Sequence, residues 1–413
     1  MSFPKDVVAA ATHPDPYQFY AGLAKDRPFG WDDGLGMWVA FGTVAVEAVL
    51  ASGLCRVRPA REPVPAALVG TTAGEIFGRL VRMTDGDGHA PLKGAISAAL
   101  ATVDMERVAS SAAELARTLW ERDEAAPVPA RVMSLAFDLS PYVVGSLLGI
   151  PDAALATVAG WMGDFVRCLA PASTPEQVER GIAAAADLAG LLTDSIRGQA
   201  NAGRNAIDRG GENRAGTPGA TSANEGGLLT ALGREIERAG IVDEAVVVAN
   251  GVGLLSQSYE ATAGLIGNTL LAPAADAERY AMIVADPSRV DGVVRETLRR
   301  DPSIQSTRRV VDRDGRIAGQ QVRTGDAILV LLAAANHDPA TRADQERGEG
   351  CGHSLGAGAH TCPGGAIAVA VAAAGVRQIV AAGVSLPELA AVFRYRSSAN
   401  ARIPLFGERE GRA

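Results

Sequence analysis

Residues 355–364 read LGAGAHTCPG, and this segment is the most informative part of the 413-residue chain. Its three glycines are Gly356, Gly358 and Gly364. Glycine tolerates positive φ angles and lets a flat ligand approach the backbone closely. Cys362 lies among these glycines, with His360 two residues before it. A thiol in such a turn can point outward, and we therefore interpret Cys362 as a ligand of a metal centre.

The segment resembles the heme-binding loop of the cytochrome P-450 family, which runs Phe-Gly-x-Gly-x-(His/Arg)-x-Cys-x-Gly. Every position agrees except Leu355, which replaces the aromatic residue. The resemblance implies that Cys362 is the axial iron ligand of heme b (iron protoporphyrin IX) and that His360 hydrogen-bonds a heme propionate. A thiolate ligand donates electron density to the iron and favours O–O cleavage.

Two other interpretations apply to the same residues. One is a glycine-rich loop with a structural cysteine. The other is a zinc site, since Cys351, His353, His360 and Cys362 form a Cys-x-His…His-x-Cys pattern. Structural zinc usually takes its ligands in Cys-x₂₋₄-Cys and His-x₃₋₅-His pairs, which one-residue gaps fit poorly. Heme is favoured over both.

Further motifs lie where the family would place them. Glu296 and Arg299 are three residues apart, close enough to pair on one face of a helix. They resemble the Glu-x-x-Arg pair that supports the core beneath the heme, with Arg347 as candidate for the third member. Arg309 resembles the propionate-binding arginine, with Arg308 as the alternative.

A further pair of candidate propionate ligands lies in the first quarter of the chain. His89 and Lys93 are four residues apart, a spacing that places both on one helix face. The family has a His-x-x-x-Arg pair here. Lys93 supplies a point charge without the fork of an arginine.

The composition limits the class of protein. A hydrophobic content of 47% is enough for a sizeable core, and a net charge of −8 argues against a nucleic-acid partner. Four cysteines at irregular spacing indicate reduced thiols. No signal peptide or long apolar run opens the chain, so we expect a soluble, cytoplasmic protein without a membrane anchor. We also expect a monomer.

The family resemblance implies a mainly α fold with small β-sheets, in one domain over residues 1–413. Helical patterns cover residues 15–24, 104–123, 130–148 and 153–169, whereas 31–40 is typical of a hairpin and 309–330 of a small sheet. Residues 201–227 contain almost no large apolar side chain, which indicates a mobile surface loop. Residues 339–353 should be irregular.

The expected distal helix departs from the family pattern, Ala/Gly-Gly-x-(Asp/Glu)-Thr-Thr. Glu260 keeps the acid, but Ala261 replaces the alcohol that follows it. Gln257 and Ser258 replace the two small residues. Thr262 is one residue late, and one residue rotates a helix position by about 100°. Either the helix is altered only for packing, or proton delivery in this chain is not standard.

The expected function is a heme-thiolate monooxygenase of bacterial type that acts on a small, natural-product substrate with O₂ and two electrons. A ferredoxin and its reductase would supply the electrons, since no flavin or iron–sulfur segment is fused to the chain. The altered distal motif makes substrate-assisted proton delivery plausible. Polar substrate contacts are expected among Tyr259, Gln305 and Ser398.

Three alternatives stay open. One is oxidative cyclisation or C–C or C–N coupling without oxygen insertion. Another is peroxide-driven oxidation, because Pro363 has no N–H to donate to the sulfur and some peroxide-using relatives share this proline. The third, from a different class, is a heme-binding protein without catalytic activity.

Overall fold

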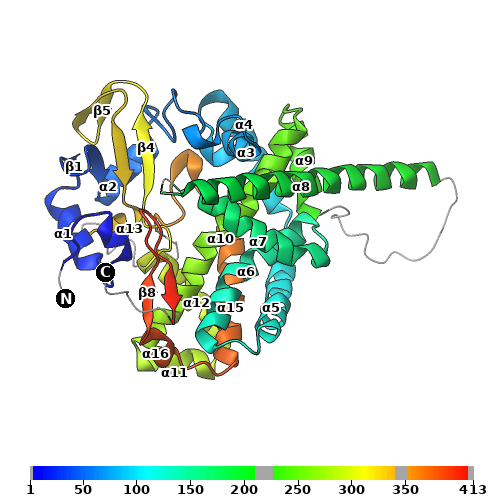
Figure 1. Ribbon diagram of the computed structural model, residues 1–413. Coiled ribbons are helices and arrows are strands. Elements are labelled where there is room, and N and C mark those ends of the chain that lie inside the picture. Colours follow the sequence, from blue (N-terminus) through cyan, green and yellow to red (C-terminus); the bar gives the residue numbers. More distant parts are fainter. Residues whose placement is uncertain (1–2, 171, 210–226, 340–351, 408–413) are drawn as a thin grey trace. The chain divides into compact units, whose positions relative to one another are not determined.

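The computed structural model describes residues 3–170, 172–209, 227–339 and 352–407, and side chains outside 199–209. Figure 1 labels the helices and strands of the described chain, which forms two compact units. Unit 1 contains residues 1–63, 105–140 and 258–413, and unit 2 contains residues 64–104 and 141–257. Neither unit is a continuous stretch of sequence. The single domain over 1–413 therefore stays a prediction.

A five-stranded sheet forms one part of unit 1, with strand order β1-β2-β7-β4-β3. Its strands are β1 Phe29–Asp32, β2 Met37–Ala40, β3 Cys55–Arg56, β4 Thr307–Val311 and β7 Ala327–Val330. Strands β1 and β2 form the expected antiparallel hairpin, with Trp31 opposite Trp38. Strand β2 runs parallel to β7, whereas β7 and β4 are antiparallel.

Side chains of β7 alternate between two hydrophobic clusters, as the two-residue period of a strand requires. Ile328 and Val330 pack with helix α2 (Thr43–Leu50) in one cluster. Leu329 packs in the other with Tyr20 of helix α1 (Tyr17–Asp26). The sheet of unit 1 is thus covered on both faces.

The remaining strands of unit 1 form two hairpins. They are β5 Gly315–Ile317 with β6 Gln320–Val322, and β8 Phe393–Tyr395 with β9 Pro404–Phe406. The strands expected over residues 309–330 are therefore present, but in two sheets: β4 and β7 lie in the five-stranded sheet, and β5 and β6 form a hairpin.

Helices make up the rest of unit 1. They are α5 Met105–Arg122, α11 Ala277–Ala285, α12 Val290–Arg300, α13 Leu332–Ala335, α15 Gly365–Ala381 and α16 Leu386–Ala390. Helix α15 packs against α5 and α12. A Cβ atom at Gly375 would lie 3.0 Å from Ile266 and 3.2 Å from Leu139, so this glycine allows close helix packing in the core.

Unit 2 is helical. Its helices are α3 Thr72–Arg79, α4 His89–Ala101, α7 Asp152–Cys168, α8 Pro175–Arg209 and α9 Gly227–Arg238. Helix α7 packs along α8, where Gly181 leaves room for Cys168. Helix α8 extends over residues 201–209, which were expected to be loop. The other residues assigned to that loop, apart from Gly227 at the start of α9, lie outside the described ones.

Two long helices, α6 Val128–Leu148 and α10 Glu244–Ala274, contribute residues to both units. The helical segments expected over 104–123, 130–148 and 153–169 correspond to α5, α6 and α7. The mainly α class with small β-sheets is confirmed.

Candidate functional site

The loop before α15 holds Cys362 in a closed turn. The Cys362 N–H donates a hydrogen bond to the carbonyl oxygen of Leu355 over 2.8 Å. Gly356 and Gly358 have φ angles of +73° and +67°, which L-residues rarely adopt. The Cys362 side chain is exposed and makes no disulfide, whereas Cys168 is buried. The turn therefore presents an accessible sulfur.

Gly358 also satisfies a packing constraint. It begins a short 3₁₀ helix, Gly358–His360, and a Cβ at this position would lie 3.2 Å from the carbonyl oxygen of Leu50 in α2. Any larger residue would push the loop away from that helix. His360, at the end of the turn, is half-buried.

The zinc interpretation includes Cys351, which lies outside the described residues, as does Arg347. Within the described ranges no group of three or more His, Cys, Asp or Glu side chains could hold a metal ion. His353 instead pairs with Glu47, with 3.0 Å between Nε2 and Oε1.

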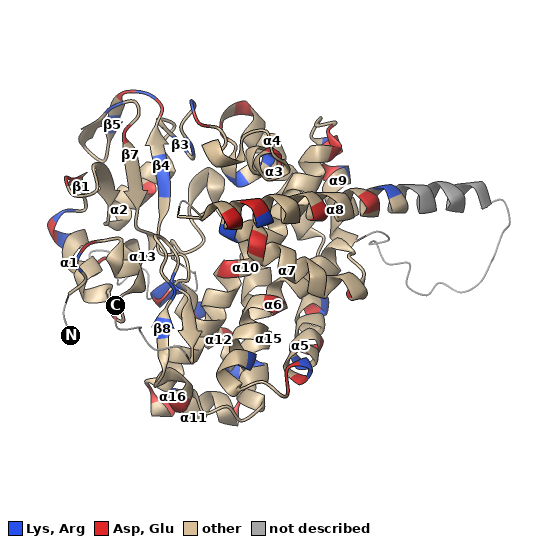
Figure 2. Ribbon diagram, viewed as in Figure 1, with Lys and Arg blue, Asp and Glu red and all other residues tan. Residues whose placement is uncertain are grey.

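The two arginines considered for propionate binding are successive residues of β4, whose ribbon is partly blue in Figure 2. Arg309 is only 7% exposed, whereas its neighbour Arg308 is exposed, because successive strand residues point to opposite faces. The Arg309 Nη1 donates to the carbonyl oxygen of Arg308 over 2.9 Å. A largely buried guanidinium is a strong donor for a carboxylate ligand.

His89 and Lys93 lie on α4 in unit 2, whereas Cys362, His360 and Arg309 belong to unit 1. His89 is the first residue of the helix and is 6% exposed; Lys93, one turn later, is half-buried. Their four-residue spacing places both on one face of α4, as expected.

The pair expected between Glu296 and Arg299 is replaced by other contacts. Glu296 forms ion pairs with Arg279 of α11 (3.3 Å) and with Arg300 one turn later in α12 (3.2 Å). No ion pair joins Glu296 to Arg299 within the described part of the chain. A contact from α11 could not be inferred from spacing within α12.

Helix α10 carries the altered distal motif. Gln257 is exposed, and Ser258 and Ala261 are half-buried, so these residues form an accessible stripe along the helix. Gln257 folds back along the helix, since its Nε2 donates to the carbonyl oxygen of Gly253 over 2.9 Å. Thr262 is 1% exposed and faces the core. Its hydroxyl therefore does not take the place of the one missing at Ala261.

Sequence reasoning missed the partner of Glu260. Arg396, in the turn after β8, forms an ion pair with Glu260, with 2.6 Å between Nη2 and Oε1. Ser303 donates a hydrogen bond from Oγ to the carbonyl oxygen of Ala261 over 2.7 Å. Neither Arg396 nor Ser303 stands in a motif, so no local signal in the sequence identifies them.

The three predicted substrate contacts have structural partners. Tyr259 packs its ring against Phe137, with centroids 5.3 Å apart. Gln305 is 1% exposed and donates from Nε2 to the carbonyl oxygen of Pro302 over 2.7 Å. Ser398 Oγ accepts from the N–H of Ala401 over 3.0 Å and so stabilises a turn. Their role in substrate binding stays a prediction.

The residues present fit a heme. An accessible, unpaired sulfur in a closed glycine turn is a soft ligand suited to iron, and the mostly buried Arg309 can pair with a carboxylate. The accessible stripe of α10 carries the uncharged side chains of Gln257, Ser258 and Ala261, so a planar group could lie against it.

Comparisons with known proteins agree with this assignment. No protein-family model matches the chain. It is 26% identical over 294 residues to cytochrome P-450 133B2 of Xylella fastidiosa, a match that covers 70% of this chain and 68% of that protein. It is 27% identical over 381 residues to the cytochrome P-450 monooxygenase PikC of Streptomyces venezuelae, covering 89% and 83%. The crystal structure of CalO2 superimposes with a TM-score of 0.73 at 25% identity, covering 98% and 97%.

The chain belongs to the cytochrome P-450 family. This cytochrome P-450 is an oxidoreductase whose family uses heme, redox partners and a small-molecule substrate. Within the described ranges, no helix of this cytochrome P-450 is long and apolar enough to cross a membrane.

Proposed function

We propose that this protein is a monooxygenase that oxidises a small natural-product substrate with O₂ and two electrons from a ferredoxin and its reductase. Heme b would be held by the Cys362 thiolate, with His360, His89, Lys93 and Arg309 binding its propionates. Gly356, Gly358 and Gly364 would leave space for the porphyrin. The accessible Cys362 sulfur in its closed turn carries this proposal.

Bound heme supplies the activation of dioxygen, which the thiolate ligand promotes. The protein residues have other tasks. Glu260 lies on α10 and is paired with Arg396, which follows β8. It is the acid available to move a proton along the accessible stripe. Ala261 has no hydroxyl to relay that proton, so a substrate hydroxyl, amine or carboxylate with ordered water completes the route.

Gln257 and Ser258 are the polar side chains of the same stripe and would orient the substrate. The buried Thr262 would take no part. Oxidative coupling without oxygen insertion is a second candidate reaction, in which hydrogen abstraction from the substrate leads to ring closure or bond formation between two substrate atoms. The departure at Ala261 supports it.

The test is the absorption spectrum of the heme-loaded protein after reduction and exposure to carbon monoxide. Thiolate ligation gives a strongly red-shifted Soret band, and we expect this band in the native protein. Cys362→Ala should abolish it, whereas Cys55→Ser, which changes another thiol that is not buried, should retain it. Survival of the band in Cys362→Ala would refute the assignment of the ligand.

A further inference from the structure

The ion pair between Glu260 and Arg396 joins two segments that are far apart in the sequence. Glu260 lies on α10, and Arg396 directly follows β8. Both side chains are partly accessible, with exposed fractions of 26% and 28%. The pair is therefore neither fully solvated nor sealed in the core.

The backbone holds Arg396 in place. Its N–H donates to the carbonyl oxygen of Ile403 over 2.9 Å, which extends the pairing of β8 with β9 by one residue. Ser398 closes the turn between the strands by accepting from the N–H of Ala401. Arg396 is thus presented from a paired hairpin and not from a loose terminus.

That hairpin is seated directly on α10. A Cβ at Gly264 would lie 2.9 Å from the carbonyl oxygen of Arg402 and 3.2 Å from Ile403. Asn268, one turn further, donates from Nδ2 to the same Arg402 carbonyl over 3.3 Å. Since Glu260 lies one turn before Gly264 on this helix, it faces the residue that pairs with Ile403, namely Arg396.

Two more contacts fix the neighbourhood of the carboxylate. The Ser303 hydroxyl bonds the carbonyl oxygen of Ala261, the residue after Glu260. The Arg396 guanidinium lies 5.9 Å from the ring centroid of Phe137, within the range of a cation–π contact. Phe137 in turn packs against Tyr259. The guanidinium is therefore restrained by a ring as well as by its partner acid.

We propose that Arg396 is a positioning residue that holds the Glu260 carboxylate in place for proton delivery. The inference rests on the proposed function, because it gives Glu260 the role of the distal acid. Without a hydroxyl at Ala261, the location of the carboxylate is set from the C-terminal hairpin instead of from the neighbouring helix residue. The turn at residues 396–401 thereby controls the proton route.

The first experiment asks whether the ion pair exists in solution. Urea unfolding midpoints are measured for Arg396→Gln, Glu260→Gln, the double variant and Arg396→Lys, with Arg323→Gln as a control that removes an exposed arginine. We expect the double variant to lose no more stability than the worse single variant, and Arg396→Lys to lose less than Arg396→Gln. Additive losses in the double variant would overturn the proposal.

The second experiment measures the role of the pair. A plant-type ferredoxin and its reductase feed electrons from NADPH to the substrate-free, heme-loaded protein in H₂O and in D₂O. We expect Arg396→Gln and Glu260→Gln to slow NADPH oxidation by similar factors and to raise the solvent isotope effect. The double variant should oxidise NADPH no more slowly than the slower single variant. Arg396→Lys should recover much of the native rate.

An Arg396→Gln variant with the native rate and isotope effect would contradict positioning by Arg396, whether or not Glu260→Gln is impaired. Every variant is first checked for the red-shifted carbon monoxide band. Absence of that band in the native protein refutes the proposed function itself. If the native protein shows the band but the substitutions at Arg396 and Glu260 act independently of each other, only the inference about Arg396 is refuted.

Discussion

At the scale of single residues, the contrast between Ala261 and Thr262 is the most informative. The family pattern places an alcohol directly after the acid, and here that position is a half-buried alanine. The next residue has the hydroxyl but turns it into the core, where Thr262 is 1% exposed. A shift of one position on a helix moves a group by about 100°, which is enough to remove it from the accessible stripe.

Ala261→Thr should improve proton delivery, because it adds a hydroxyl to the accessible stripe next to Glu260. With ferredoxin, its reductase and NADPH, we expect less hydrogen peroxide to be released per NADPH consumed. Peroxide and NADPH are measured in the same reaction. Thr262→Val, which changes a hydroxyl facing the core, should leave the ratio unaltered. If Thr262→Val altered the ratio and Ala261→Thr did not, the assignment of the stripe would be wrong.

At the scale of secondary structure, α10 depends on glycines where other segments approach it. At Gly264 a Cβ would lie 2.7 Å from Cβ of Ser303, and at Gly267 one would lie 2.9 Å from Pro404. These glycines cost helix propensity, yet they allow the C-terminal hairpin to reach the helix. The hairpin could not otherwise hold Arg396 near Glu260.

Gly264→Ala should therefore destabilise the fold, because the added methyl group meets the Ser303 side chain and the Arg402 backbone. We expect a loss of about 1–3 kcal/mol in the free energy of unfolding, measured with urea. Gly292→Ala is the matched control in helix α12, since no atom lies within 4 Å of its added Cβ. That control should gain up to about 1 kcal/mol from helix propensity. A stabilising Gly264→Ala would mean that the hairpin does not press on α10.

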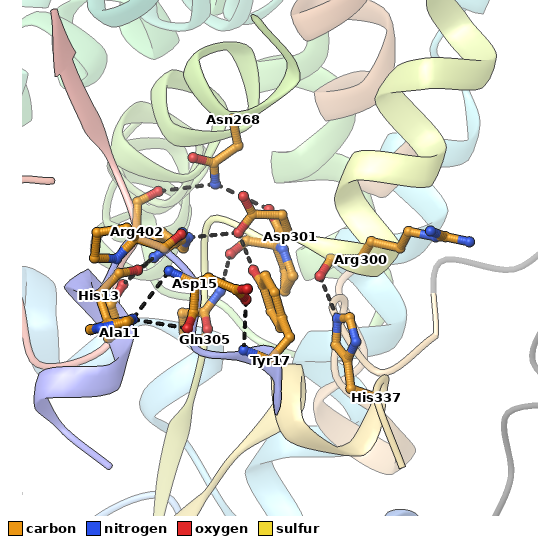
Figure 3. Close-up of polar contacts among 12 residues, drawn as sticks. Ala11, His13, Asp15, Tyr17, Asn268, Arg300, Asp301, Gln305, His337 and Arg402 are labelled. Carbon is orange, nitrogen blue, oxygen red and sulfur yellow. Dashed lines mark hydrogen bonds and ion pairs between the residues drawn. The ribbon is translucent and has the colours of Figure 1, made fainter. Parts of the chain in front are cut away.

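At the scale of the whole chain, a buried polar network ties distant segments of unit 1 together (Figure 3). Arg402 is 1% exposed and binds the Asp301 carboxylate over 2.7 Å. It also donates to the backbone carbonyls of His13 and Pro14. Tyr17 donates its hydroxyl to Asp301 as well. The N-terminal segment, the end of α12 and the C-terminal hairpin thus meet at one guanidinium.

Burial in this region affects the tyrosines. Desolvation raises the pKa of Tyr17, Tyr20 and Tyr395 above the ordinary value of 10.0. Since the pKa is higher in the folded state, the folded protein keeps these protons at pH values where the unfolded chain loses them. The contribution of these tyrosines to stability is therefore constant below about pH 10 and falls above it, by up to about 1.4 kcal/mol per pH unit for each tyrosine.

Tyr20→Phe should remove the contribution of Tyr20 to the loss of stability at alkaline pH. Within the described structure the buried Tyr20 hydroxyl has no hydrogen-bond partner, so its loss should leave stability at pH 7 unchanged or raise it by up to about 1 kcal/mol. The decline above pH 10 should become less steep. Urea unfolding across pH 7–11 measures both effects. An unchanged alkaline slope would show that Tyr20 titrates normally in the folded protein.

Much of the fold and of the candidate site was predictable from local patterns. The helices α5, α6 and α7, the first hairpin and the Cys362 loop follow from periodicity and spacing over short stretches, because the groups involved are neighbours in sequence. The extension of α8 into residues 201–209 was not predictable in this way, since polar composition does not prevent a helix from continuing.

The sequence by itself determined the glycine-rich loop that presents the Cys362 sulfur and the absence of an alcohol at Ala261. Only the tertiary structure decided that Glu260 pairs with Arg396 and that Glu296 pairs with Arg279. It also showed which of two adjacent arginines, Arg308 or Arg309, is buried. The physical reason is that an ion pair or a burial depends on which surfaces the folded chain brings into contact, and such contacts leave no regular spacing in the sequence.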